Sequence, residues 1–306
     1  MTVAYLTHEV FLRHDMGRHH PECPQRLSAI SDQLIASGLA PLLHHHEAPL
    51  ATDQQLARAH EAGYVQAVRS IAPQQGMVQL DPDTAMCPDS LEAALRAAGA
   101  GVLAVDLIMG GQASSAFCAV RPPGHHAMRD RAMGFCIFNN IAVAALHALE
   151  VHGLKRVAVV DFDVHHGNGT EDILGGDARV VMTGTFQHPF YPYSGTDRPA
   201  ANMHNVPLAS GADGKALRQA FETVCLPALE DFAPQMLFIS AGFDAHIEDD
   251  MAMLRFTDSD YAWVTGVLQD VARRHASGRI VSMLEGGYAL SALGRSVAAH
   301  IRTLLD

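Results

Sequence analysis

The sequence predicts an α/β protein folded as a single domain over residues 1–306, with a mostly parallel central sheet and helices on both faces. Short runs rich in Val, Ile and Ala alternate along the chain with longer Ala- and Leu-rich segments of helical period. Several of the short runs are apolar throughout, which is typical of strands buried on both faces of a parallel sheet. Since no repeat, low-complexity tract or linker divides the chain, we expect one domain.

The predicted elements follow one another in the strand and helix alternation of a parallel sheet. The expected strands are Val3–Leu6, Ser115–Val120, Arg156–Val160, Val180–Thr183, Gln235–Ile239 and Arg279–Met283. The expected helices are Gln25–Ala36, Leu91–Met109, Asn140–His152, Lys215–Asp231, Asp258–His275 and Ala289–Leu304. In such a sheet, ligands bind outside the carboxyl ends of the strands.

Composition limits the classes of function. Hydrophobic residues make up 48% and charged residues 18% of the chain, and no apolar run approaches the roughly 20 residues that span a membrane. The net charge is −12 without a basic cluster, which disfavours direct nucleic-acid binding and favours cationic ligands. The N-terminal segment resembles a short strand more than a signal peptide, so we expect a cytoplasmic protein.

The five cysteines are odd in number and form no C-x-x-C pair, which argues against a disulfide framework and against a Cys-based zinc site. Free thiols in a reducing compartment fit best. We hypothesise that Cys87 and Cys136, in loops expected to rim the site, approach one another and can be oxidised. The alternative, two ordinary buried thiols, is favoured.

Four polar, glycine-containing loops follow four of the predicted strands. They are Arg121-Pro-Pro-Gly-His-His126, Asp161-Phe-Asp-Val-His-His-Gly-Asn-Gly169, Ala241-Gly-Phe-Asp244 and Glu285-Gly-Gly-Tyr288. Because the carboxyl ends of parallel strands lie at one edge of the sheet, these loops are expected to meet there. Their convergence indicates a site more strongly than any one motif does.

Asp163 and His165 stand two residues apart at a strand end, so their side chains point the same way. With Asp244 they supply two carboxylates and one imidazole, and three protein ligands leave a metal coordination position open for water. Zinc is the first choice, and Fe²⁺ accepts the same ligands. Alternatively, Asp161 and Asp163 cap the following helix while His165 packs inside.

A binuclear site is a second alternative, since carboxylates and histidines also build two-metal centres. A second ion would need another carboxylate beside Asp244, and the sequence offers His246 two residues on. Glu248, Asp249 and Asp250 resemble a solvated acidic loop. One catalytic metal is therefore favoured.

His125 and His126 follow Pro-Pro-Gly, which fixes a sharp loop, and one of them can act as the general base and acid of a hydrolase. Tyr288, placed by Gly286 and Gly287, can donate a hydrogen bond to the oxyanion of a tetrahedral intermediate. Gly134 and Phe135 add an aromatic wall suited to a long aliphatic stem. The run at 44–46, three histidines, is interpreted as structural or surface.

These residues resemble a known family, the zinc-dependent histone deacetylase and acetylpolyamine amidohydrolase superfamily, particularly its class II-like branch. The matching strings are Arg121-Pro-Pro-Gly-His-His-Ala127, Gly134-Phe-Cys-Ile-Phe-Asn-Asn140, Val160-Asp-Phe-Asp-Val-His-His-Gly-Asn-Gly-Thr170, Ala241-Gly-Phe-Asp-Ala245 and Glu285-Gly-Gly-Tyr288. His20-Pro-Glu-Cys-Pro-Gln-Arg-Leu27 and Leu80-Asp-Pro-Asp-Thr84 resemble two early loops of the family. The similarity extends over almost the whole chain.

The resemblance implies an arginase- and deacetylase-like fold, with one zinc ion held by Asp163, His165 and Asp244 at the base of a narrow tunnel. It implies that His126 is the general base and acid, oriented by Asn168 where class I relatives carry an aspartate. An uncharged partner should hold an imidazolium less strongly than a carboxylate does.

The same resemblance makes His125 an electrostatic histidine partnered by Asp161, and it makes Tyr288 the catalytic tyrosine. Phe135, with Gly134, Gly286 and Met251, belongs to the implied substrate tunnel. The backbone around Asp161, Asp163, His165, Thr185 and Phe186 resembles the potassium site of the family. Hydrogen bonds alone could also close these loops.

The expected substrate is an acyl-lysine peptide or protein, or an acylated polyamine, and the sequence does not predict the oligomeric state. Polyamine-selective relatives carry a carboxylate at the tunnel mouth, where this chain has Met251, which favours acyl-lysine or a broad amide range. Asp83 and the acidic residues 248–250 offer negative charge nearby. An acyl-lysine binding module without activity is the alternative from another class, and the complete set of candidate ligands, base and tyrosine argues against it.

Overall fold

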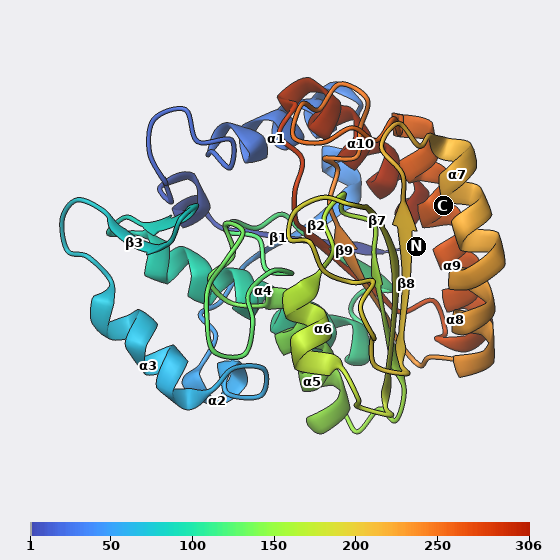
Figure 1. The fold of residues 1–306 in the computed structure, drawn as a ribbon, viewed down its shortest axis with the longest axis horizontal. Coiled ribbons are helices and arrows are strands. Elements are labelled where there is room, and N and C mark those ends of the chain that lie inside the picture. The colour runs from blue at the N-terminus through green and yellow to red at the C-terminus, as the bar shows by residue number, and fades with distance from the viewer. Residues whose placement is uncertain (1) are drawn as a thin grey trace.

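The computed structural model describes residues 2–306, and an eight-stranded sheet lies at its centre (Figure 1). The strand order is β2-β1-β5-β10-β9-β6-β7-β8, and all the pairings in this sheet are parallel. The strands are β1 (Val3–Thr7), β2 (Leu43–Glu47), β5 (Ser115–Cys118), β6 (Val157–Asp161), β7 (Val180–Gln187), β8 (Met203–Leu208), β9 (Leu237–Ala241) and β10 (Ile280–Leu284). The predicted fold class is confirmed.

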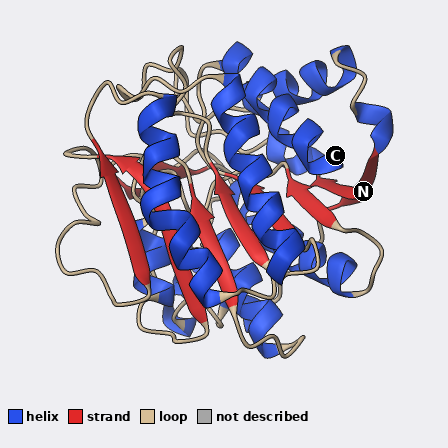
Figure 2. Cartoon of the chain, turned by 90° about the vertical axis from the view of Figure 1, so that its right-hand side faces the viewer, coloured by secondary structure: helices blue, strands red, loops and turns tan. Residues whose placement is uncertain are grey.

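Helices cover both faces of the sheet (Figure 2). They are α1 (Gln25–Ala36), α2 (Asp53–Leu56), α3 (Ala62–Ile71), α4 (Ser90–Met109), α5 (Asn140–Glu150), α6 (Asn168–Leu174), α7 (Gly214–Ala220), α8 (Leu226–Phe232), α9 (Asp258–His275) and α10 (Leu290–Leu305). Two short 3-10 turns lie at Glu9–Leu12 and Ala40–Leu42, and a π-helical turn at Phe221–Cys225 joins α7 to α8. Helices α4 and α5 pack together, as do α1, α10 and α9.

The six predicted strands are the six inner strands of the sheet, and most of their residues are apolar or small. All residues of β5, β6, β9 and β10 are buried, as the uninterrupted apolar runs predict. These four strands are neighbours in the order β5-β10-β9-β6. The four polar loops therefore leave adjacent strands at the same edge.

The prediction missed the more polar elements. Strand β2 is Leu-His-His-His-Glu at one edge of the sheet, with His44 and His45 exposed, and β8 at the other edge contains Pro207. The hairpin of β3 (Val78–Asp81) and β4 (Thr84–Met86) and the helices α2, α3 and α6 were also missed. The single helix predicted over Lys215–Asp231 is instead interrupted by the π-helical turn.

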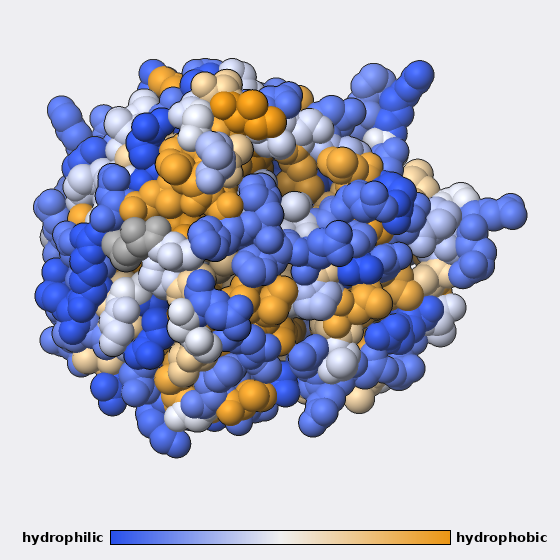
Figure 3. Space-filling model, turned by 180° about the vertical axis from the view of Figure 1, so that it is seen from behind, coloured by the Kyte–Doolittle hydropathy of each residue, from blue (hydrophilic) through white to orange (hydrophobic). Residues whose placement is uncertain are grey.

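No helix within residues 2–306 is long and apolar enough to cross a membrane. On the face seen in Figure 3, hydrophilic residues cover most of the surface and hydrophobic ones lie in groups between them. The apolar core lies between the sheet and its helices. The site described next lies above this core, at the carboxyl ends of the strands.

Candidate active site

The predicted metal ligands converge at the carboxyl ends of β6 and β9. Asp163, His165 and Asp244 are all buried, and one ligand atom from each lies within 4.8 Å of the others. His165 Nδ1 lies 3.0 Å from Asp163 Oδ1 and 3.3 Å from Asp244 Oδ2. Asp244 Oδ1 accepts a hydrogen bond from Val164 N at 3.0 Å, and Asp163 Oδ2 accepts one from Gly286 N at 2.9 Å. Three separate loops thus fix the two carboxylates.

Two observations fit a metal ion at this position. Asp244 Oδ2 is buried and, within the described residues, makes no hydrogen bond of good geometry, with only His165 Nδ1 beside it at 3.3 Å, which leaves it suited to bind a cation. Gly286 also leaves room beside the carboxylates, because a Cβ at this residue would lie 2.0 Å from Asp244 Oδ2 and 2.7 Å from Asp163 Oδ2. Two carboxylates, one imidazole nitrogen and a confined space match the ligands of a divalent metal such as zinc.

A second group of metal-type side chains, Asp106, His147 and His152, is satisfied without an ion. Both imidazoles donate from Nε2 to Asp106 Oδ1, at 2.8 and 2.7 Å. Arg58 donates to His147 Nδ1 at 3.1 Å, so the proton of a neutral His147 lies on Nε2, the atom that a metal would need. We therefore interpret this group as a hydrogen-bonded link between α4 and the end of α5.

The binuclear alternative receives no support from the residues beside Asp244. His246 Nε2 lies 3.3 Å from Asp258 Oδ1, and its Nδ1 accepts from Glu248 N, so both ring nitrogens have partners away from the ligands. The interpretation of residues 248–250 as a solvated acidic loop is wrong for Asp249. This side chain is buried and accepts hydrogen bonds from Tyr288 N, Ala289 N and Met251 N.

The two adjacent histidines have different partners. His125 Nδ1 donates to Asp161 Oδ2 at 2.9 Å, and its Nε2 lies 3.8 Å from Asp163 Oδ1. Burial acts to lower the pKa of His125, but the carboxylates of Asp163 and Asp161 outweigh it and hold this pKa well above the usual value. In these surroundings His125 carries a positive charge.

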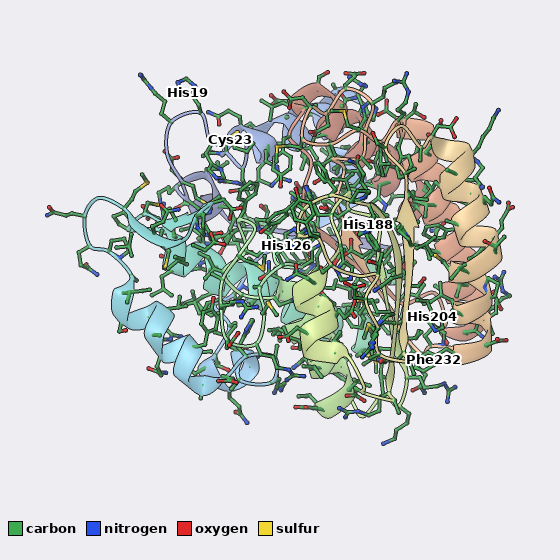
Figure 4. The ribbon with its side chains drawn as sticks, in the orientation of Figure 1. His19, Cys23, His126, His188, His204 and Phe232 are labelled. Atoms are coloured by element: carbon green, nitrogen blue, oxygen red, sulfur yellow. The ribbon has the colours of Figure 1, made fainter. Side chains whose placement is uncertain are left out.

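His126 has the opposite electrostatic state. Its Nδ1 donates to Asn168 Oδ1 at 2.7 Å, which leaves Nε2 with a free lone pair. Burial, followed by the charges of His125 and His165, holds the pKa of His126 well below its usual value. A neutral imidazole beside a metal position is suited to accept a proton from water. In the view of Figure 4, His126 lies near the middle of the molecule, whereas His19 points outward from the N-terminal loop.

Tyr288 follows the tight Gly286-Gly287 turn, with Gly287 in the left-handed region at φ +120°. Burial and the nearby carboxylate of Asp244 raise the pKa of Tyr288 well above its usual value, so the hydroxyl stays protonated as a donor. The guanidinium of Arg26 stacks on the Tyr288 ring, 5.0 Å from its centroid. The Phe135 ring meets it edge-on at 5.9 Å.

These groups surround a cavity of about 140 Å³. It is lined by Asp83, Pro123, His125, His126, Gly134, Phe135, His165, Phe190, Tyr191, Met251, Gly286 and Tyr288. Gly134 is required by close approach, because a Cβ there would lie 2.3 Å from the His126 ring. Phe135 holds the left-handed φ of +68°, a conformation that non-glycine residues rarely adopt outside functional sites. Every residue predicted for the tunnel thus lines it.

Sequence reasoning missed the buried groups that hold the loops together. Glu285 accepts from Gly124 N at 2.7 Å and from His125 N at 3.1 Å, which ties the histidine loop to β10. Arg26 donates to the carbonyls of Glu285 and Gly287, at 2.5 and 2.7 Å. The opposite tunnel wall, Phe190 and Tyr191, was also missed, although its Phe-Tyr-Pro-Tyr stretch is rich in aromatic residues.

The two cysteines proposed to approach one another have separate partners. Cys87 Sγ contacts Arg13 O and Ser90 Oγ, whereas Cys136 Sγ contacts Gly134 O. Burial raises the pKa of Cys136 well above its usual value, which disfavours the reactive thiolate. All five cysteines are free. The structure gives the redox hypothesis no support.

The residues of the potassium prediction lie next to the metal ligands, between β6 and β7. Asp161 Oδ1 accepts from Asp163 N at 3.0 Å, and the hydroxyl of Thr185 is buried without a hydrogen bond in the described residues. Asp161, His165, Thr185 and Phe186 line a small cavity here.

Fold and site together define an α/β protein with a buried group of metal-type ligands beside a cavity at the carboxyl ends of the strands. Comparison with known proteins identifies the family. A model of the histone deacetylase domain matches residues 20–304, so the chain belongs to the histone deacetylase family. The family assignment from sequence is confirmed. Its members are hydrolases of the deacetylase and amidohydrolase type.

Individual relatives agree. The histone deacetylase-like amidohydrolase of Pseudomonas aeruginosa is 39% identical over 277 residues, which cover 88% of this chain and 73% of that protein. The polyamine deacetylase HDAC10 of Mus musculus is 36% identical over 307 residues, 93% of this chain and 45% of that protein. The crystal structure of the HDA15 HD domain matches with a TM-score of 0.93 and 35% identity, over 99% of this chain and 88% of that one.

Proposed function

We propose that this protein is a zinc-dependent amidohydrolase that removes an acetyl or other short acyl group from acyl-lysine or a related primary-amine substrate. One observation carries the proposal. His165 from the buried trio of metal-type ligands, a neutral histidine with a free Nε2, and a protonated tyrosine all line the same cavity. A binding module would need the cavity but not the acid–base groups.

A zinc ion held by Asp163, His165 and Asp244 would supply Lewis-acid chemistry, polarising the amide carbonyl and making water more acidic. His126 takes the proton of the attacking water at Nε2 and later delivers it to the leaving amine. Tyr288 donates a hydrogen bond to the oxygen that becomes negative. His125, held by Asp161, contributes positive charge next to this oxygen, and Asn168 keeps the lone pair of His126 directed at the cavity.

The cavity favours a long, thin substrate. Phe135, Phe190 and Tyr191 provide aromatic walls, which suit the methylene stem of a lysine or polyamine. Met251 lines the cavity and is partly exposed, and an apolar side chain in this place favours acyl-lysine over a dication. An acetylpolyamine is the second candidate, favoured by the net charge of −12 and by the mouse polyamine deacetylase among the relatives.

Steady-state kinetics on acetyl-lysine peptides, N-acetylputrescine, N-acetylspermidine and longer acyl-lysines, with the metal content of the same sample, test the proposal. We expect turnover that follows the zinc content. A preference of about a hundredfold, worth roughly 2.7 kcal/mol, would assign the substrate class. Turnover that survives both Asp163→Ala and zinc removal would contradict the proposed mechanism.

We also propose a structural potassium ion, held near Asp161, Asp163, His165, Thr185 and Phe186. Its support is the buried, unpaired Thr185 hydroxyl. In wild type, exchanging potassium for tetramethylammonium at constant ionic strength should lower the melting temperature. Thr185→Val keeps the shape but removes the oxygen, so its melting temperature should respond less. Equal responses in the two proteins would reject the site.

A further inference from the structure

The segment that carries Tyr288 is held at each residue by a side chain or backbone group from elsewhere. Gly286 N donates to Asp163 Oδ2 at 2.9 Å, and Phe243 N donates to Gly286 O at 3.0 Å. Arg26 Nε donates to Gly287 O at 2.7 Å. The next two amides, Tyr288 N and Ala289 N, both donate to one oxygen, Asp249 Oδ2, at 2.6 and 2.9 Å.

Asp249 is unusual in this position, because its neighbours Glu248 and Asp250 are exposed whereas its own side chain is only 5% exposed. Helix α10 begins at Leu290 and has no cap from its own N-terminal residue, Ala289. The Asp249 carboxylate, from another loop, binds the two amides that precede the first residue of this helix. The positive end of the helix dipole and the backbone N–H groups compensate the buried charge.

The same carboxylate reaches the rim of the tunnel. Asp249 Oδ1 accepts from Met251 N at 3.1 Å, while its Oδ2 holds Tyr288 and Ala289. Met251 and Tyr288 both line the cavity. One buried carboxylate therefore links the residue at the tunnel mouth to the tyrosine beside the metal ligands.

The Tyr288 ring has few other constraints. Arg26 lies over the face of the ring and Phe135 meets it edge-on. The hydroxyl makes no hydrogen bond within residues 2–306. Gly287, just before it, has φ +120° and the backbone freedom of a glycine. The backbone amide of Tyr288 is thus the fixed point from which the hydroxyl is aimed.

We propose that Asp249 is a positioning residue: it sets the place of the Tyr288 hydroxyl and couples it to the tunnel rim at Met251. The role in catalysis rests on the proposed deacylase function. Asp249 makes no hydrogen bond to the three metal ligands within residues 2–306, and its charge acts on one of them, Asp244, only through space. Its replacement should therefore slow the chemical step without releasing zinc.

Asp249→Asn is nearly isosteric but replaces one acceptor oxygen by a donor, so it cannot hold all three amides. We expect kcat on an acetyl-lysine peptide to fall about tenfold or more, since small misplacements of reacting groups cost this much. KM and zinc content should change little. Tyr288→Phe should lose about 10²-fold to 10³-fold as an oxyanion donor is removed.

The double variant separates positioning from a general structural role. If Asp249 acts through the Tyr288 hydroxyl, Asp249→Asn adds less than about twofold in a Tyr288→Phe background, because the two residues act as a unit. If the loss of kcat in the double variant is instead the product of the two single losses, the proposal is overturned. Asp213→Asn is the matched control: Asp213 also caps a helix, α7, by accepting from Lys215 N at 3.0 Å. It should lower stability and leave kcat unchanged.

Hydrogen exchange of the wild-type protein tests the proposal without an activity assay and without relying on the folding of a variant. In wild type, the amides of Tyr288 and Ala289 should exchange slowly, and exchange as fast as in an exposed loop would overturn the proposal. Asp249→Asn should speed their exchange, and Asp213→Asn should not. If wild type hydrolyses none of the acylated amines, the proposed function fails, while the exchange rates still decide whether Asp249 fixes this segment.

Discussion

At the scale of single residues, the site obtains different chemistry from identical side chains. His125 and His126 are neighbours in sequence, with ring centroids 4.1 Å apart. Burial lowers the pKa of both rings, but the carboxylates of Asp163 and Asp161 outweigh it at His125, whereas the charges of His125 and His165 add to it at His126. Pairs of titratable groups with opposed environments indicate separate acid–base roles. The charges around each imidazole therefore decide its protonation, although both residues are histidines.

Met251 offers a residue-scale test of substrate choice. Met251→Glu would place a carboxylate at the rim, where the second ammonium of an acetylpolyamine would lie. We expect kcat/KM for N-acetylspermidine to rise by about tenfold relative to an acetyl-lysine peptide, consistent with about 1.4 kcal/mol from a partly solvated charge pair. The gain should shrink with added salt.

The control for this substitution lies two residues on. Met253 is 63% exposed and does not line the cavity, so Met253→Glu adds the same charge to the same loop outside the tunnel. If Met253→Glu shifts selectivity as much as Met251→Glu, general attraction by the acidic surface decides the substrate. The assignment of Met251 to the tunnel rim would then be wrong.

At the scale of elements, a buried charge cluster joins the segment before α1 to the central strands. Glu22 pairs with Arg26 on α1 and, through both carboxylate oxygens, with Arg121 after β5. All three side chains are fully buried. Since Arg26 in turn holds Glu285 O and Gly287 O, the cluster supports the Tyr288 segment from below.

Glu22→Gln should destabilise the protein strongly, because two buried guanidinium groups lose their only counter-charge in the cluster. We expect a loss of about 3–5 kcal/mol in the free energy of unfolding, measured by chemical denaturation. Glu9→Gln is the control, since Glu9 pairs with Arg13 at the surface and should cost under about 1 kcal/mol. Equal losses in the free energy of unfolding of the two variants would show that the buried cluster stabilises the protein no more than a surface ion pair does.

The same pair of proteins has a defined pH dependence. Burial opposes the charge of Glu22, but Arg121 and Arg26 outweigh it and lower its pKa to about 2. A carboxyl whose pKa is lower in the folded state contributes stability above its unfolded pKa near 4.3, and that stability is lost as the pH falls towards the folded pKa. Wild type should thus lose its advantage over Glu22→Gln between about pH 4.3 and pH 2. A constant difference across this range would contradict it.

How much the sequence predicts differs from element to element. Strands β5, β6, β9 and β10 are fully buried and mostly apolar, and the loops that follow them carry most of the site, so their positions could be predicted. Strands β2 and β8 were not predicted from the sequence, because edge strands tolerate histidine, asparagine and proline. Helix α6 has only seven residues, too few to show a clear period.

Partners distant in sequence could not be predicted. In the sequence, Asp249 resembles its exposed neighbours. Only the fold brings it into contact with Tyr288, 39 residues away. Glu22 and Arg121 are 99 residues apart, and no local pattern signals their contact. The proximity of Asp163 and His165 could be predicted, since they stand two residues apart just after a strand, although the structure has them in bends rather than in extended backbone.

At the scale of the whole molecule, a metal ion at the strand ends would join segments that are otherwise far apart in the chain. Asp163 and His165 follow β6, Asp244 follows β9, and Gly286 after β10 donates to Asp163. Two buried carboxylates face each other here and repel when both are charged. A bound divalent ion removes this repulsion, so its binding free energy adds to the stability of the entire fold.

Zinc should therefore raise the melting temperature of chelator-treated protein. At a free concentration 100 times the dissociation constant, the gain is about 2.7 kcal/mol, which is about 4 °C for a chain of this length. Differential scanning calorimetry across a zinc series measures the shift. Asp163→Asn should abolish the response, because it removes one of the three ligands. A zinc response that persists in Asp163→Asn would place the ion elsewhere in the molecule.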